Sequence, residues 1–260
     1  MSEASLAPSR GLIRREWDVA AASLARPYRV TVPMVLMMLL VPCYIFIGDG
    51  MSGRPTHTPA ISWDLAIPVR PAWALVYGCL YLFLIVLPVL VVRQEELIRR
   101  TVLAYLFVWI TAYVFFVFYP TSAPRPAELA GDGFAAWGLR FLYGADPPYN
   151  CFPSLHVAHS FVSALACRRV NRRVGDAAMA CASLVGLSTL FTKQHYVADV
   201  AAGVLLAGAA WAIFLRSYAR EAPDADRRAA PALATLVLAA IAVALLGFWI
   251  AYRAGAGAGA

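Results

Sequence analysis

The chain alternates long apolar runs with short polar stretches. A helix needs about 20 residues to cross the hydrocarbon core of a bilayer, and several of the runs reach or approach that length. We therefore expect an all-α polytopic membrane bundle, whose fourth and fifth helices are short because their outer ends stop in a polar pocket. The seven expected crossings are Val30–Ile47, Ala72–Val92, Val102–Tyr119, Ser154–Ala166, Ala177–Phe191, Val197–Leu215 and Ala232–Tyr252.

The polar stretches also predict how the chain is divided. Residues 1–29 form a cytoplasmic arm that lacks the apolar centre and cleavage site of a signal peptide. Residues 30–216 form a six-helix core, residues 217–252 a linker and a seventh, C-terminal transmembrane helix, and residues 253–260 a Gly/Ala tail that we expect to be disordered. In the long loop Pro120–Pro153, the aromatic stretch Phe134–Tyr143 suits either a short helix in the headgroup zone or an ordinary connection.

Composition agrees with a membrane protein. Apolar side chains make up 61% of the chain and charged ones 14%, with a mean hydropathy of +0.66, whereas a soluble domain has about 25% charged residues. The formal net charge is +7, but the basic residues are spread between apolar runs, which argues against a nucleic-acid-binding face. The five cysteines lack disulfide or zinc spacing, so we interpret them as small packed residues.

The arginines predict the orientation, because positive residues concentrate on the cytoplasmic side of membrane proteins. They gather in the N-terminal arm and in every second loop, so the remaining loops are expected to face outward. The excess of arginine over a single lysine favours a GC-rich bacterial genome, and hence a location in the inner membrane. The expected cytoplasmic arginines are Arg10, Arg14, Arg15, Arg26, Arg29, Arg93, Arg99, Arg100, Arg168, Arg169, Arg172, Arg173, Arg216, Arg220, Arg227 and Arg228.

Two short segments, Cys151–His159 and Thr192–Asp199, contain three of the four histidines and the only lysine. Ionisable groups among apolar spans are costly, so such a cluster is a functional-site hypothesis by default. In the predicted topology both segments emerge on the extracytoplasmic side, as does Arg125. We expect one site where they meet.

The residue types at this site suit nucleophilic or anion-binding chemistry. His195 and Asp199 lie four residues apart at a helix start, so a carboxylate can fix the imidazole tautomer and leave the other ring nitrogen as a nucleophile or metal ligand. His156 follows Ser154, the expected N-cap of another helix whose N-terminus favours an anion.

Two cations could bind a phosphate at the same place. Arg125 offers a planar fork and Lys193 a point charge, although an arginine at a membrane edge can also simply snorkel to the interface. His159, one turn after His156, either packs against its neighbours or contacts substrate. Further possible substrate contacts are Tyr149, Asn150 and Tyr196.

Two other kinds of site compete with this interpretation. His156, His159, His195 and Asp199 are workable zinc ligands, but no other acidic residue lies close to them in the sequence. A transporter or a non-catalytic lipid-binding protein could use the same cluster, yet a transport path would place ionisable residues at mid-depth, and the predicted spans have none there.

The polar segments resemble motifs of the type-2 phosphatidic acid phosphatase (PAP2) superfamily of lipid phosphatases and phosphotransferases. Phe152–His156 is similar to the second motif, His195–Gly203 to the third, and the Arg125-Pro126 pair to the end of the first. Leu155 and Tyr196 make the pattern most similar to the inositol phosphorylceramide synthase-like branch. The resemblance extends from the third predicted helix to the sixth.

This resemblance implies a PAP2-type six-helix core and a reaction without metal or cofactor. His195 would attack phosphorus and form a phosphohistidine, Asp199 would orient it, and His156 would protonate the departing oxygen. The substrate would be a lipid phosphate or phospholipid in the membrane, either hydrolysed or used to transfer a headgroup to a lipid alcohol such as ceramide. The phosphoryl oxygens would be held by Arg125, Lys193 and Ser154.

Two departures from the family pattern affect phosphate binding. The lysine of the first motif is Phe118 here, and the arginine of the third motif is Thr189. Both missing side chains bind phosphate in the family. We interpret Lys193 as the replacement for one of these cations.

Overall fold

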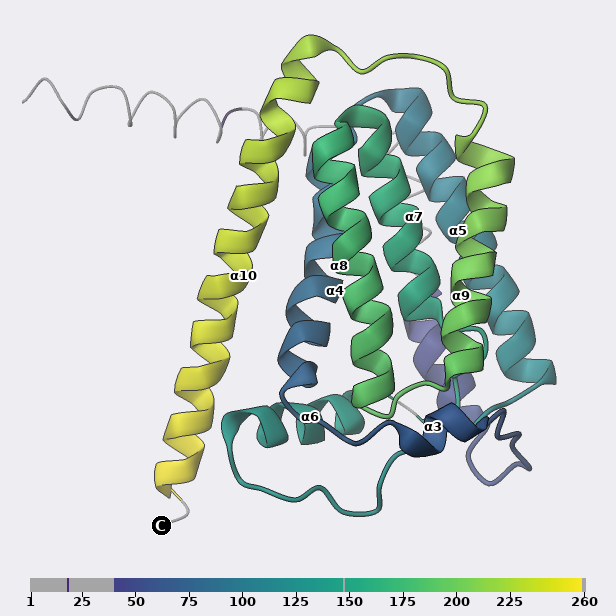
Figure 1. Ribbon diagram of the computed structural model, residues 1–260, viewed down its shortest axis with the longest axis vertical. Coiled ribbons are helices and arrows are strands. Elements are labelled where there is room, and N and C mark those ends of the chain that lie inside the picture. The colour runs from purple at the N-terminus through teal and green to yellow at the C-terminus, as the bar shows by residue number, and fades with distance from the viewer. Residues whose placement is uncertain (1–17, 19–39, 147, 259–260) are drawn as a thin grey trace, which may run out of the picture.

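The computed structural model describes residue 18, residues 40–146 and residues 148–258, and these residues form helices and loops without a β-strand (Figure 1). The predicted all-α class is therefore confirmed. Residues Leu40–Gly50 form an apolar helix. The others are α3 (Ser62–Ala66), α4 (Trp73–Val91), α5 (Glu95–Phe118), α6 (Phe134–Ala145), α7 (Leu155–Val170), α8 (Arg172–Phe191), α9 (Val197–Ala210), which continues into a π-helical turn Trp211–Leu215, and α10 (Asp224–Ala258).

Among the described residues, five helices are long and apolar enough to cross a membrane: Trp73–Val91, Glu95–Phe118, Arg172–Phe191, Val197–Leu215 and Asp224–Gly255. This supports the predicted multi-pass membrane bundle. Helix α7 has 16 residues and is short, as predicted. Residues 30–39 of the first predicted crossing, and the arginines of the N-terminal arm, lie outside the described residues.

Helix α8 corrects the prediction that the fifth crossing is short. It has 20 residues and begins at Arg172, not near Ala177. Its first turn is stabilised locally, because the Asn171 side chain accepts a hydrogen bond from the Val174 N–H and Arg172 pairs with Asp176 one turn later. Hydropathy missed this turn because its residues are charged.

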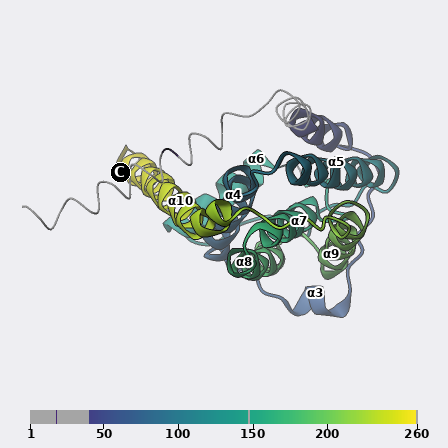
Figure 2. The same ribbon diagram turned by 90° about the horizontal axis from the view of Figure 1, so that it is seen from above.

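Helix α7 occupies the middle of the bundle, between α4, α5, α8 and α9 (Figure 2). Most of its side chains are buried, and several are small, such as Ala158, Ser160 and Ala164, which lets neighbouring helices approach closely. Helix α9 approaches α7 closely at Gly203, since a Cβ at this position would lie 2.6 Å from the main-chain oxygen of Ser154. The glycine therefore brings the start of α9 against the start of α7.

Helix α6 lies across the lower end of the bundle in Figure 1. It confirms that the aromatic stretch is helical, while its place in the headgroup zone stays a prediction. Rings of Phe134 and Trp137 pack on Tyr252 of α10. Helix α10 stands beside α4 and extends to Ala258, past the predicted end at Tyr252 and into the tail that was expected to be disordered.

The loops at the α6 end are tied together by main-chain contacts. Isolated bridges connect His57 with Thr121 and Thr121 with Asn150, and the Phe152 N–H donates to the Thr121 side chain over 2.9 Å. The segment before α7 is thus fastened to the segment after α5. These contacts position the two polar segments.

Candidate active site

His156, His195 and Asp199 meet at the α6 end of the bundle. His156 stands in the first turn of α7, His195 in the loop between α8 and α9, and Asp199 in the first turn of α9. The His156 Nδ1 and His195 Nε2 atoms are 3.2 Å apart, and His195 Nδ1 lies 3.4 Å from Asp199 Oδ2. All three side chains are buried, so the structure forms one continuous His-His-Asp chain.

The hydrogen bonds along this His-His-Asp series define where the protons lie. A carboxylate only accepts hydrogen bonds, so the His195 Nδ1–H donates to Asp199 and His195 Nε2 carries a lone pair. His156 Nδ1 then donates its proton to that lone pair. One histidine therefore presents a nucleophilic nitrogen, and the other presents a proton beside it.

The loop around His195 is held by its own backbone. The main-chain N–H groups of Gln194 and His195 donate to the Thr189 carbonyl, and Asp199 also accepts the Tyr196 N–H over 2.8 Å. A carboxylate at this position closes the first turn of α9 and interacts favourably with the helix dipole. His195 is thus fixed from both sides before any substrate binds.

Ser154 is the N-cap of α7, as expected, because its hydroxyl accepts the Val157 N–H over 3.4 Å. Its own N–H donates to the Asp199 carbonyl over 3.0 Å, so it connects α7 with α9. The main-chain donors left for an anion are those of the next residues, Leu155 and His156, which no helical carbonyl can reach. Ser154 would therefore contribute to anion binding indirectly, because it caps the helix whose first N–H groups would face the anion.

Arg125 is engaged by an acid that the sequence did not single out. Its Nη1 donates to the carbonyls of Tyr143 and Asp146 over 3.0 and 2.8 Å, and its Nη2 lies 3.5 Å from the Asp146 carboxylate. The guanidinium also stacks 4.6 Å above the Tyr143 ring. Its Nε is buried without a hydrogen-bond partner among the described residues, so Arg125 is ordered and keeps donor capacity.

Asp146 is in turn held by the helix Leu40–Gly50, since the Tyr44 hydroxyl donates to its Oδ1 over 2.7 Å. The same helix accepts a hydrogen bond at the Tyr44 carbonyl from Asn150, over 2.7 Å. Asn150 is therefore a buried link between loops, while Tyr149 beside it is half-buried. Neither Tyr44 nor Asp146 could be found from sequence, because Tyr44 lies far from both motifs and Asp146, just before Cys151, has no spacing that reveals its contact with Arg125.

Lys193 lies two residues before His195 and has a left-handed backbone, with φ of 52°. Its ammonium donates to the main-chain carbonyl of Asp64 over 2.7 Å. The Asp64 carboxylate accepts the Val197 N–H over 2.8 Å. Helix α3 therefore covers the loop that holds His195, and Lys193 keeps two further N–H donors.

The remaining predicted contacts differ in their access to the site. Tyr196 is buried at the start of α9, next to His195 in the sequence. His159 accepts a hydrogen bond from the Trp109 indole over 3.2 Å and stacks on Tyr105 at 4.3 Å. It also lines, together with His156, an apolar cavity of about 380 Å³ between α4, α5 and α7. His57, the remaining histidine, is exposed and stacks on Tyr119.

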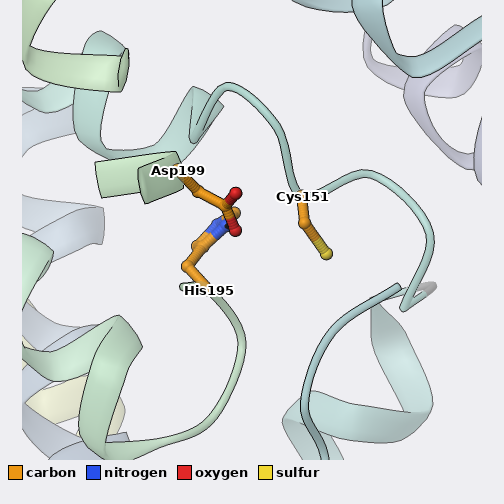
Figure 3. A group of neighbouring side chains, drawn as sticks. All are labelled: Cys151, His195 and Asp199. Atoms are coloured by element: carbon orange, nitrogen blue, oxygen red, sulfur yellow. Dashed lines mark hydrogen bonds and ion pairs between the residues drawn. The ribbon is translucent and has the colours of Figure 1, made fainter. Parts of the chain in front are cut away.

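The structure does not assemble the zinc site that was weighed from the sequence. Among the described residues, the group that could hold a metal joins Cys151 with His195 and Asp199, without His156 or His159. Figure 3 shows the Asp199 carboxyl and the His195 ring side by side, with Cys151 across from them on the loop before α7. Burial, and the negative charge of Asp199, raise the pKa of the Cys151 thiol well above its usual value. A protonated thiol is a poor zinc ligand, so the arrangement of Cys151, His195 and Asp199 favours hydrogen bonding over metal binding.

No disulfide joins the five cysteines, as their spacing predicted. Cys151 and Cys167 are buried and Cys79 and Cys181 half-buried, whereas Cys43 is exposed and does not fit the interpretation as a packed residue.

Residues 65–213 match a family model described as the PAP2 superfamily. This match covers more than half of the chain and includes every residue of the His-His-Asp chain. No curated protein and no solved structure matches the chain.

Proposed function

The chain belongs to the PAP2 superfamily, and from this membership together with the paired histidines we propose that it is a membrane lipid phosphatase or phosphotransferase that works through a phosphohistidine. The single observation that carries the proposal is the contact between His156 Nδ1 and His195 Nε2, backed by Asp199. It offers a nucleophile and an acid to the same phosphoryl group.

In the first half of the reaction, His195 Nε2 forms a bond to phosphorus as the bond from phosphorus to the lipid oxygen breaks. His156 gives its Nδ1 proton to that departing oxygen, and Asp199 stabilises the positive charge on the His195 ring. A phosphorus atom cannot fit between nitrogens 3.2 Å apart, so the two rings separate as the phosphoryl group enters. The product is a lipid alcohol and phosphohistidine.

In the second half, water or an alcohol attacks phosphorus while His156 accepts its proton. The bond between phosphorus and His195 Nε2 breaks, which restores the lone pair and the original protonation of both rings. Water as the acceptor releases inorganic phosphate. A lipid alcohol as the acceptor would produce a phosphosphingolipid-type headgroup transfer, the alternative suggested by Leu155 and Tyr196.

The phosphoryl oxygens need cations, and the two positions that supply them in the family do not do so here. Phe118 is 81% exposed at the end of α5, and Thr189 is fully buried with its hydroxyl bonded to the Gly186 carbonyl. We therefore assign the phosphate to Arg125, Lys193 and the start of α7. Arg125 has an unused buried Nε among the described residues, and Lys193 has two donors beyond the one bonded to Asp64.

Arg125→Gln and Lys193→Ala are each expected to raise the KM for a lipid phosphate about tenfold or more, because a hydrogen bond to a charged group contributes about 1.5–3 kcal/mol. Steady-state kinetics in detergent micelles measures the effect. Arg140→Gln on α6 is the matched control, since Arg140 is exposed and bonds only main-chain oxygens of a loop. An unchanged KM and kcat in Lys193→Ala would remove Lys193 from the phosphate site.

We place the active site on the extracytoplasmic side of a bacterial inner membrane. The support is the distribution of arginines: the loop between α7 and α8 and the loop after α9 are basic, and both lie at the end of the bundle opposite the histidines (Figure 1). The positive-inside rule assigns that basic end to the cytoplasm. The substrate would then approach from the outer leaflet.

Phosphorus NMR of the detergent-solubilised protein with total bacterial lipids, and without added metal, tests the proposed function. Free phosphate that appears with the wild type, and not with His195→Ala, would identify a phosphatase. A new phosphodiester signal without free phosphate would identify a headgroup transferase. Identical spectra from folded wild type and His195→Ala would overturn the catalytic proposal in favour of a non-catalytic lipid-binding or transport protein.

A further inference from the structure

The apolar cavity beside His156 extends from the active site deep into the bundle. Its walls reach Val92 at the end of α4 and Ile98 in the first turns of α5, at the end of the bundle opposite the histidines. From Trp109 to Ile98 the α5 wall spans about 16 Å, at 1.5 Å per residue. The volume, about 380 Å³, lies within the range of small-molecule sites.

The cavity also opens sideways to the outside of the bundle. Two of its lining residues, Val41 and Ile85, are 46% and 38% exposed. Both are apolar and face the region that a bilayer would fill. A hydrocarbon chain could therefore enter from the membrane without crossing water.

Most polar side chains on the cavity wall already have hydrogen-bond partners. The Tyr105 hydroxyl bonds Ser163 over 2.7 Å, the Thr101 hydroxyl donates to the Leu97 carbonyl over 2.7 Å, and the Trp109 indole donates to His159. A wall of this kind presents apolar surface to a ligand, and such cavities bind hydrocarbon. The deeper part of the cavity thus suits an aliphatic chain.

His159 is the exception, because one of its ring nitrogens has no hydrogen-bond partner among the described residues. An indole N–H can only donate, so His159 Nδ1 is the acceptor and the neutral ring carries its proton on Nε2. Within the described part of the chain, no hydrogen bond to that Nε2 is formed. The side chain is 4% exposed and lines the cavity.

The hydroxyl of Tyr81 is a second polar group without a hydrogen-bond partner among the described residues, and the Tyr81 ring lies beside His159. Its ring packs edge-on against His156 at 4.9 Å and against His159 at 6.2 Å, and its hydroxyl makes no hydrogen bond with the described residues. His156 and His159 are three residues apart on one helix face, so their Cβ atoms are about 5–6 Å apart. The cavity therefore has His156 at its active-site end, next to it the two polar groups of His159 and Tyr81, and beyond them an apolar tube.

We propose that His159 and Tyr81 recognise a carbonyl oxygen of an acyl lipid, an ester or amide, whose chain fills the cavity while its phosphate lies against His195. This inference rests on the proposed function and narrows its substrate class. A polyprenyl phosphate has no carbonyl oxygen between its phosphate and its hydrocarbon chain. Its hydrocarbon chain would cover both polar groups and give them no hydrogen-bond partner, and a site built to hydrogen-bond a substrate discriminates strongly against an analogue that lacks the group.

The test compares phosphatidic acid with its dialkyl ether analogue of the same chain length, which lacks only the carbonyls. We expect wild type to favour the ester in kcat/KM by about tenfold or more, and to use a polyprenyl phosphate as poorly as the ether. His159→Phe and the nearly isosteric Tyr81→Phe should each bring the ester-to-ether ratio towards one. A ratio measured within one variant cancels any loss of folded protein.

His57→Phe provides the matched control, because it makes the same replacement at an exposed histidine whose stacking on Tyr119 a phenylalanine retains. Its ester-to-ether ratio should equal that of wild type. Turnover of both lipids at equal rates by wild type, or an unchanged ratio in both His159→Phe and Tyr81→Phe, would overturn the carbonyl site and leave the phosphatase intact. No turnover of any lipid by folded wild type would overturn the proposed function as well.

Discussion

Replacement of His195 by alanine is expected to lower phosphoryl transfer by about 10⁴-fold or more, because no other nucleophile can take its place. Among the neighbouring groups, the Cys151 thiol stays protonated, and the Ser154 hydroxyl is used as a helix cap. His156 faces His195 through a nitrogen that donates a proton. Only His195 presents a lone pair backed by a carboxylate.

The measurement is turnover of a lipid phosphate, with rapid quenching in alkali to trap phosphohistidine, which is stable there. Wild type should give a trapped phosphoprotein and His195→Ala none. His57→Ala, a change at an exposed histidine, should behave as wild type, and thermal unfolding of all three proteins checks that they are folded. More than a tenth of wild-type turnover in His195→Ala would contradict the nucleophile assignment.

The helices that long apolar runs predicted are present, because membrane crossing imposes a length and a hydropathy that composition alone reveals. The prediction was wrong where a helix begins with charged residues. Arg172 and Arg173 open α8, and Glu95 and Glu96 open α5 seven residues before its expected start. Hydropathy detects the part of a helix that lies in lipid, whereas caps and local ion pairs extend it beyond.

The meeting of His156, His195 and Asp199 could be expected from the motifs, because spacing placed each at a helix end on the same side. Their catalytic roles stay predictions. The contacts of Arg125 and Lys193 could not be expected, since their partners lie in segments whose position depends on tertiary packing: Asp146 follows the end of α6, and Asp64 belongs to the short helix α3. An isolated acid in such a segment has no periodicity or spacing that reveals its partner.

The cavity illustrates a second limit. His159 was interpreted as packing or contacting substrate, and the structure shows both the packing against Tyr105 and the free face towards the cavity. A helical pattern places His159 on the same face as His156. It does not reveal that Trp109, on another helix, fixes its tautomer. Hydrogen-bond direction across helices requires coordinates.

His156→Ala is expected to affect substrates according to their leaving group. With a lipid alcohol as the leaving group, turnover should fall by about 10²–10⁴-fold, the usual contribution of a positioned general acid. With a phosphate ester of nitrophenol, whose anion leaves without a proton, formation of phosphohistidine should proceed at nearly the wild-type rate. Rapid-quench kinetics separates these two steps.

The same variant should accumulate phosphohistidine from the nitrophenyl ester, because His156 is also the base that activates water in the second step. An initial burst of nitrophenol, equal to one per active site and followed by slow release, is the expected signature. His195→Ala should give no burst. If His156→Ala loses activity equally with both leaving groups, its contact with His195 orients the nucleophile instead of supplying a proton, and the acid must come from elsewhere in the site.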